Sequence, residues 1–172
     1  IVIETAGAEQ GGLLLMRDEA LQLAVEVRAG ARSGEPEIVV PREPTDADPN
    51  KLPERIVSYV VRTHDLVLLA DATHAEDDVS NFASDPYVTT YSPRSLLCMP
   101  ILKQGGLIGV LYLENRLAVG AFTPAHVSTL ELLVLQAAIA IENAQIYNEI
   151  EDRVEERTRA LSVEIAERKR VA

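Results

Sequence analysis

The two longest apolar stretches of the chain lie close together, at residues 96–102 and 107–113. A Lys-Gln-Gly-Gly turn at residues 103–106 joins them, and glycine supplies the positive φ angles that a tight hairpin needs. Neither stretch alternates apolar with polar residues, which indicates strands that are buried on both faces. The pattern therefore predicts a β-hairpin in the middle of a sheet. Gly109, inside the second strand, indicates a bulge or the close approach of another backbone.

Shorter apolar patterns before this hairpin predict further strands at residues 13–17, 21–28 and 66–69. The region 29–53 holds five of the nine prolines, and within it only residues 38–40 have the composition of a strand. The prolines on both sides place that strand at a sheet edge. A helix is expected next, with Asn50 as its cap, Pro53 in its first turn and an end near His64.

Residues 71–93 are mostly polar but hold three of the seven Phe and Tyr residues of the chain. A long loop that is rich in aromatic side chains serves either as a lid over a pocket or as a packing cover. Together with the two residues that follow the loop, these aromatics are the best candidates for binding a ligand. The alternative is that they simply pack on the sheet, since a collapsed apolar pocket has the same sequence pattern. The candidate ligand-binding residues are Phe82, Tyr87, Tyr91, Arg94 and Ser95.

A long C-terminal helix is predicted by the start signals at residues 122–124. Thr123 is the expected N-cap, Pro124 suits the first helical position, and Phe122 is placed to pack on Val127. Apolar residues then recur at helical spacing, and no glycine or proline follows to end the helix. The residues expected to dock on the sheet are Val127, Leu130, Val134, Ala137 and Ile141.

Beyond about residue 141 the apolar pattern narrows to a heptad seam. The tail from Asn148 carries seven acidic and six basic residues around this seam. Such a helix cannot bury a narrow apolar stripe alone, so we expect a parallel homodimer with a coiled coil. The predicted division is a domain at residues 1–146 and a signalling helix at residues 147–172. The seam residues are Tyr147, Ile150, Val154, Leu161 and Ile165.

The composition limits the possible partners and compartments. A formal net charge of −11 disfavours binding to nucleic acid or to an anionic membrane surface. No uninterrupted apolar run approaches the ~20 residues of a membrane span, and no leader pattern occurs. A single cysteine cannot form an internal disulfide, which fits a reducing cytoplasm. We therefore expect a soluble cytoplasmic domain, and residues 1–6 are interpreted as the end of a helix that starts further upstream.

No motif of an enzyme or a metal site is found in the chain. It has no Ser-His-Asp order, Walker loop or dinucleotide fingerprint, and its three histidines are scattered without metal-ligand spacing. Cys98 lies inside an apolar strand and is expected to be a buried core residue rather than a reactive thiol. We therefore expect a regulatory domain without catalytic or metal-binding residues, and the sequence leaves any cofactor unknown.

Residues 94–115, the Phe-Thr-Pro sequence at 122–124 and the helix behind it closely resemble the C-terminal half of a GAF domain. The resemblance is strongest to GAF domains that are joined to sensor kinases in bacterial signalling proteins. It implies an α+β, PAS-like fold, with an antiparallel sheet of five or six strands, helices on one side, a ligand pocket on the other and a long C-terminal coiled-coil helix.

The same resemblance implies a sensory module that binds an unknown small molecule or relays a conformational state. The C-terminal helix would carry the signal to an effector such as a histidine kinase or a PAS module. The alternative is a structural dimerisation module with a closed pocket. Cyclic-nucleotide-binding members often carry an Asn-Lys-x-Phe-Asp-Glu pattern, of which this chain has only the Asn-Phe pair at residues 81–82.

Overall fold

The computed structural model describes residues 7–17, 19–29, 36–41, 45–46, 52–72 and 82–171. Its strands are β1 (Gln10–Arg17), β2 (Ala20–Ala29), β3 (Pro36–Val39), β4 (Thr45–Asp46), β5 (Val67–Leu69), β6 (Ser95–Lys103) and β7 (Gly106–Asn115). Its helices are α2 (Glu54–Thr63), α3 (Pro86–Tyr91) and α4 (Pro124–Val171). The chain divides into two compact units, Ile1–Ala138 and Ile139–Ala172, and the boundary along the sequence falls within α4. The predicted division at residue 147 also lies within α4 and stays a prediction.

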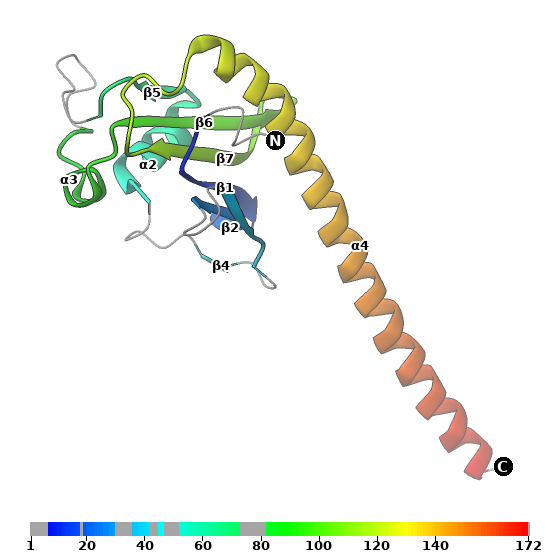
Figure 1. Cartoon of the computed structure of the whole chain (residues 1–172). Coiled ribbons are helices and arrows are strands. Elements are labelled where there is room, and N and C mark those ends of the chain that lie inside the picture. The colour runs from blue at the N-terminus through cyan, green and yellow to red at the C-terminus, as the bar shows by residue number, and fades with distance from the viewer. Residues whose placement is uncertain are drawn as a thin grey trace. The chain divides into compact units, whose positions relative to one another are not determined.

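The strands form one antiparallel sheet in the order β3-β2-β1-β7-β6-β5. Figure 1 labels β2, β1, β7, β6 and β5 of this sheet. The two-residue β4 pairs with β2 beside this path. The prediction of an α+β fold with five or six antiparallel strands is confirmed, with β4 as a short addition. The hairpin formed by β6 and β7 lies between β5 and β1, which confirms its place inside the sheet. The proline-flanked β3 lies at an edge, as predicted.

Gly109 lies both beside an irregularity of the strand pairing and at a close approach of another backbone, which are the two alternatives that its sequence context indicates. It pairs with Leu15 of β1 on one side and with Ile101 of β6 on the other, and the β6–β7 register shifts immediately after Ile101. A Cβ atom at Gly109 would lie 2.3 Å from the carbonyl oxygen of Leu14. Only glycine therefore allows β1 and β7 to approach each other at this point.

Different helices cover the two faces of the sheet. Alternate residues of a strand point to opposite faces, so Cys98 and Val110 face α2 and α3, whereas Met99 and Ile101 face α4. The face toward α2 and α3 carries the main buried cluster. Its members are Leu14, Leu52, Ile56, Val57, Val60, Val67, Leu69, Ala72, Phe82, Tyr87, Val88, Leu96, Cys98, Val110 and Tyr112.

Helix α2 starts later than the sequence pattern predicts. Its N-cap is Pro53, which makes no side-chain capping hydrogen bond, and the expected cap Asn50 lies outside the described residues. The prediction of a helix with Pro53 in its first turn is thus wrong. Pro53 is tolerated at the cap because the N–H groups at a helix start have no partner within the helix. The predicted end is confirmed, since α2 ends at Thr63 and His64 takes a left-handed C-cap conformation.

Helix α4 begins as predicted, with the backbone N–H of His126 donating to Oγ1 of Thr123 over 3.3 Å. Its buried positions are Val127, Leu130, Val134 and Ala138. The prediction that Ala137 docks on the sheet is wrong, because Ala137 is exposed. The next buried residue after Val134 is Ala138, four positions later, which follows the 3.6-residue period of the helix.

One helix of the described chain, Pro124–Ser162, passes a length-and-composition test for a membrane span, with a mean hydropathy of 1.5 in its best 18-residue window. The prediction rested on uninterrupted apolar runs, whereas polar residues such as Thr129, Glu131 and Gln136 interrupt the apolar residues of this helix. Four residues of α4 belong to the buried core of the domain. Only 22% of that window is buried, and a test of length and composition is weak evidence for a membrane span.

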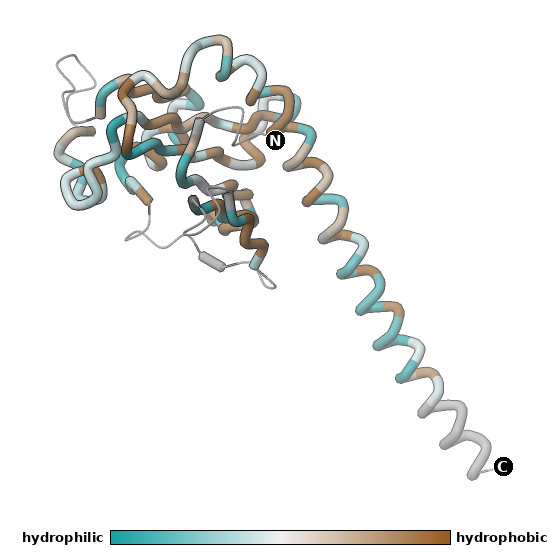
Figure 2. The backbone as a smooth tube through the Cα atoms, viewed as in Figure 1, coloured by the Kyte–Doolittle hydropathy of each residue, from teal (hydrophilic) through white to brown (hydrophobic). Residues whose placement is uncertain are grey.

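The predicted dimer seam lies on an exposed part of α4, in the unit Ile139–Ala172. Tyr147, Ile150, Val154 and Leu161 are all more than half exposed, and the side chain of Ile165 lies outside the described residues. Figure 2 shows hydrophobic positions that recur along a mostly hydrophilic helix. An exposed apolar stripe of this kind is what a coiled-coil partner would cover. The homodimer itself stays a prediction.

Cys98 is fully buried in β6, and burial raises the pKa of its thiol far above the usual range. We expect a thiol reagent to label native Cys98 far more slowly than the unfolded chain, because the reactive thiolate is disfavoured. We expect Cys98→Ala to lower the free energy of unfolding by about 1 kcal/mol. Mass spectrometry of timed labelling and urea unfolding measure the two effects. Rapid labelling under native conditions would contradict a core role.

Candidate functional site

Helix α3 begins at a strong local cap. Asp85 accepts a hydrogen bond from the backbone N–H of Tyr87 over 2.8 Å, and Pro86 occupies the first helical position. The second carboxylate oxygen of Asp85 accepts from the backbone N–H of Arg55 over 2.9 Å, which joins α3 to the first turn of α2. Asp85 is almost fully buried, so both bonds are shielded from water. The prediction of a loop over residues 71–93 is wrong for residues 86–91, because a helix of six residues gives little periodic signal.

A buried polar cluster lies beneath α3, where α3 meets the central strand β7. We call Tyr87, Tyr112, Glu114 and Arg116 the Glu114 cluster. The Glu114 carboxylate is fully buried, and its Oε2 atom accepts from the hydroxyl of Tyr87 over 2.8 Å and from the hydroxyl of Tyr112. Its Oε1 atom accepts from Nε of Arg116 over 2.7 Å. The carboxylate thus has three donors, which is what a buried charged group requires.

The electrostatics of the cluster keep both tyrosines as donors. Burial, and then the charge of Glu114, raise the pKa values of Tyr87 and Tyr112 well above the usual range for tyrosine. Burial lowers the pKa of Arg116, but the Glu114 carboxylate beside it outweighs that effect, and the net shift is upward. Both hydroxyls stay protonated and Arg116 stays charged at physiological pH. Glu114 therefore accepts hydrogen bonds from two protonated hydroxyls and one charged guanidinium.

The aromatic rings around the cluster are in contact with one another. The Tyr87 ring centroid lies 4.6 Å from that of Tyr91 and 6.2 Å, edge to face, from that of Tyr112. The guanidinium carbon of Arg116 lies 5.2 Å from the centroid of the Tyr91 ring, a cation–π distance. The side chain of Arg116 is 38% exposed, so the cluster reaches the surface at this end.

A family model for the GAF domain matches residues 1–141. The chain belongs to the GAF domain family. This confirms the family that the sequence resembles.

Two curated relatives are histidine kinases. The chain is 38% identical over 92 residues to hybrid signal transduction histidine kinase G of Dictyostelium discoideum, covering 54% of this chain and 3% of that protein. It is 27% identical over 125 residues to peroxide stress-activated histidine kinase mak3 of Schizosaccharomyces pombe, covering 72% of this chain and 5% of that protein. The chain therefore spans only a small part of each relative. Neither relative is bacterial, and a bacterial origin stays a prediction.

A solved structure supports the fold. The GAF domain of a two-component sensor histidine kinase from Bacillus halodurans aligns with a TM-score of 0.53 and 18% sequence identity. The alignment covers 86% of this chain and 92% of that one. At this identity the likeness concerns the fold alone.

The GAF domain brings only some of the predicted ligand-binding residues together. Phe82 and Tyr87 are buried in the core cluster, and Tyr91 is 44% exposed beside Tyr87. Ser95 is buried, and its hydroxyl donates to the carbonyl of Leu69 and accepts from the N–H of Ala121, so it holds backbone segments in place. The side chain of Arg94 is exposed. None of these placements shows ligand binding, so the five residues stay candidates.

Sequence reasoning missed the sheet-side members of the cluster. Tyr112 and Glu114 are two positions apart in β7, so they lie on one face of the strand, and Arg116 follows two positions later, just past the end of β7. A usable signal was present, because Glu114 is an acidic residue at the end of an otherwise apolar central strand. Its importance depends on Tyr87, which lies 27 residues away in sequence.

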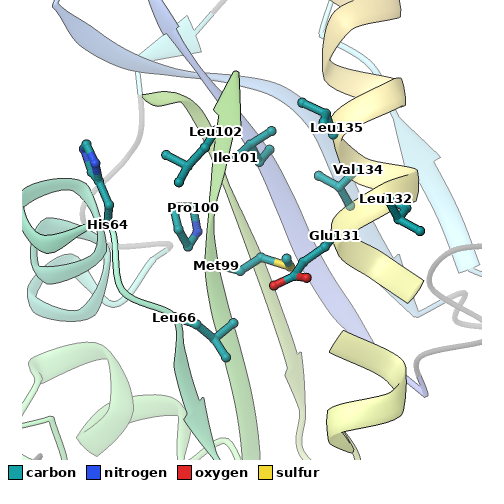
Figure 3. Close-up of a pocket in the computed structure, with 10 residues that line it drawn as sticks. All are labelled: His64, Leu66, Met99, Pro100, Ile101, Leu102, Glu131, Leu132, Val134 and Leu135. Carbon is teal, nitrogen blue, oxygen red and sulfur yellow. The ribbon is translucent and has the colours of Figure 1, made fainter. Parts of the chain in front are cut away.

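A hollow of the GAF domain lies on the face of the sheet opposite the Glu114 cluster, between β6 and α4 (Figure 3). Its volume is about 320 Å³, and its floor is apolar, with Met99, Ile101 and Val134 among its lining residues. Two polar side chains line it, and Figure 3 shows Glu131 extending from α4 toward Met99, with His64 on the other side. None of these residues was predicted to bind a ligand. The hollow is an apolar groove without a cluster of convergent polar groups.

Proposed function

We propose that this GAF domain is a sensory module that responds to a small molecule or to a conformational state and transmits the response through α4. The effector would be a histidine kinase or a PAS module elsewhere in the full-length protein, since histidine kinases contain matching segments. The module would work as a cytoplasmic homodimer in a two-component system. Its role would be regulatory rather than enzymatic, because the buried carboxylate of Glu114 is engaged by donors of the domain itself.

The observation that carries this proposal is the continuity of α4. The helix runs from Pro124 to Val171 without a break, and its early residues Val127, Leu130 and Val134 are part of the domain core. A displacement of the sheet would therefore reach a stiff helix that continues into the second unit. Such coupling requires two helix arrangements that the stimulus favours unequally, and typical coupling energies are about 1–3 kcal/mol.

One observation favours the alternative, a dimerisation module with a closed pocket. The space between the sheet and the helices α2 and α3 contains packed side chains, among them Phe82, Tyr87 and Tyr112. A domain of this kind would hold two effectors together without responding to a ligand. The two functions differ in whether a change at α3 alters α4.

Spin labels on the distal part of α4 test both the dimer and the relay. We expect Glu155→Cys, labelled in a Cys98→Ala background, to give a defined distance between the two labels of a homodimer by pulsed electron paramagnetic resonance. We expect Tyr87→Ala to shift that distance distribution, since it removes the contact between α3 and Glu114. Thr90→Ala, an exposed change on the same helix, is the matched control and should leave the distribution unchanged.

The possible outcomes separate the two functions. Absence of dipolar coupling between labels at micromolar concentration would contradict the homodimer. A defined distance that Tyr87→Ala leaves unchanged would contradict the relay and favour the plain dimerisation module. Circular dichroism of each variant confirms that the domain is folded before the distances are compared.

A further inference from the structure

We propose that the Glu114 cluster is a binding site for a small neutral aromatic ring that carries a hydroxyl group, and that Tyr87 fills this site when α3 is closed. A ligand would bind by displacing Tyr87 and taking over its hydrogen bond to Glu114. The inference rests on the proposed sensory function, to which it adds a ligand class and a mechanism of competition.

The partners of Glu114 come from two different elements of the fold. Tyr112 lies in β7 and Arg116 directly follows it, so both stay beside Glu114 whatever α3 does. Tyr87 is the member of the cluster that α3 supplies. If α3 moved away, Oε2 of Glu114 would lose one of its two hydroxyl donors. A buried carboxylate in that state needs a replacement donor from water or from a ligand.

The charges of the site indicate the kind of ligand. Glu114 and Arg116 form an ion pair of 2.7 Å, so their charges balance each other. A charged ligand would leave one charge in excess in a site where Glu114 is fully buried, which is costly. A neutral hydroxyl can donate to Glu114 as Tyr87 does now. The nearby guanidinium can also donate to that hydroxyl oxygen, since Nη2 of Arg116 lies 3.5 Å from Oη of Tyr87.

The walls of the site indicate that the hydroxyl belongs to an aromatic ring. The ring of Tyr87 contacts the rings of Tyr91 and Tyr112 at geometries that are typical of aromatic pairs. Tyr112 is buried and Tyr91 lies partly at the surface, so the site has a closed inner end and an outer end near solvent. A planar ring that replaced Tyr87 would keep both contacts.

Helix α3 is built in a way that allows Tyr87 to leave. The helix has six residues, and so short a helix has little stability of its own. Its backbone hydrogen bonds close locally, from Asp85 to Phe82, from Thr89 to Asp85 and from Ser92 to Val88. The contacts described between α3 and the sheet are made by side chains, so α3 can shift without breaking the pairing of any strand.

Competition with Tyr87 predicts an unusual effect of removing this residue. The affinity of a ligand falls by the fraction of molecules in which the site is open. If Tyr87 were a ligand-contacting residue, its removal would weaken binding. If Tyr87 fills the site, its removal should strengthen binding.

The experiment uses the full chain with 4-fluorophenol as the probe, titrated by ¹⁹F NMR, and fluorobenzene as the matched probe without a hydroxyl. We expect Tyr87→Ala to bind 4-fluorophenol at least about tenfold more tightly than the natural chain, because the site is no longer filled. We expect the same variant to prefer 4-fluorophenol over fluorobenzene by about tenfold, the value of a hydrogen bond to a charged group. The double variant Tyr87→Ala with Glu114→Gln should lose most of this preference.

Two further variants keep the test decisive. Tyr59→Ala removes a ring of the same layer, one that packs on Phe82 rather than beside Glu114, and should not gain a preference for the hydroxylated probe. If Tyr87→Ala does not fold, Tyr87→Phe keeps the ring and loses the hydrogen bond. It should still bind 4-fluorophenol several-fold more tightly than the natural chain.

Equal binding of the two probes to Tyr87→Ala, or weaker 4-fluorophenol binding than in the natural chain, would overturn the inference. Either result would leave the sensory proposal standing, because that proposal is measured by the distances between spin labels on α4. A hydroxyl preference that depends on Glu114 would support the site even if those distances did not change. The two proposals can therefore fail separately.

Discussion

Replacing Glu114 with alanine should lower the free energy of unfolding by about 3 kcal/mol, at the lower end of the range for breaking a buried ion pair. The change leaves the hydroxyls of Tyr87 and Tyr112 without the acceptor they share inside the protein. Arg116 also loses its partner, but its side chain is 38% exposed and can turn toward water. This partial escape to solvent is why we expect the lower end of the range.

Urea unfolding followed by circular dichroism measures this loss. Glu114→Gln is the conservative comparison, since it keeps the shape and one acceptor oxygen but removes the charge, and we expect it to retain part of the stability. Glu131→Ala is the exposed control, an acidic residue of α4 that should change the stability by no more than about 0.5 kcal/mol. A Glu114→Ala protein as stable as the Glu131→Ala protein would show that the cluster contributes nothing to folding.

The second large effect is expected at Gly109. Gly109→Ala should lower the free energy of unfolding by about 3 kcal/mol or more, the upper part of the range for overpacking. The new Cβ atom would lie 2.3 Å from the carbonyl oxygen of Leu14 and 3.0 Å from a methyl carbon of Leu15. A side chain can rotate away, but the Leu14 carbonyl belongs to the backbone of β1. Relief therefore requires β1 and β7 to separate at the centre of the sheet.

A matched control lies three residues away in the same strand. At Gly106 the nearest atom to an added Cβ is the carbonyl oxygen of Lys103, at an ordinary contact distance of 3.5 Å. We expect Gly106→Ala to change the stability by less than about 1 kcal/mol, because no backbone has to move. If the two alanine variants unfolded at the same urea concentration, the close approach of β1 and β7 would be refuted.

Local sequence signals predicted the elements whose causes lie within a few residues. The hairpin, the cap at Thr123, the end of α2 at His64 and the need for glycine at 109 are all confirmed. Each depends on backbone geometry or on apolar periodicity, and both are properties of neighbouring residues. The family was also predictable, because residues 94–115 carry the resemblance that the match to the GAF domain confirms.

Local signals were insufficient where an element was very short or where several residues fitted the same apolar pattern. Helix α3 was taken for a loop because its six residues cannot show a helical period, although Asp85 and Pro86 form a good start signal. The contact of Ala137 was wrong by one residue, because several alanines and apolar residues of α4 fit a core face almost equally well. Which of these residues is buried depends on the strands against which the helix packs.

The sequence by itself thus determined the central hairpin and the long helix α4, because apolar periodicity and caps act over short distances. The fold class followed from the resemblance to GAF domains. Only the tertiary structure decided which side chains form the candidate site. Tyr87 and Glu114 lie 27 residues apart and belong to elements without a sequence signal for pairing. Their hydrogen bond exists because the sheet carries Glu114 beneath α3, which presents Tyr87 to it. The hydrogen-bond partners of a buried carboxylate are the side chains that lie near it in space, and the whole fold decides which these are.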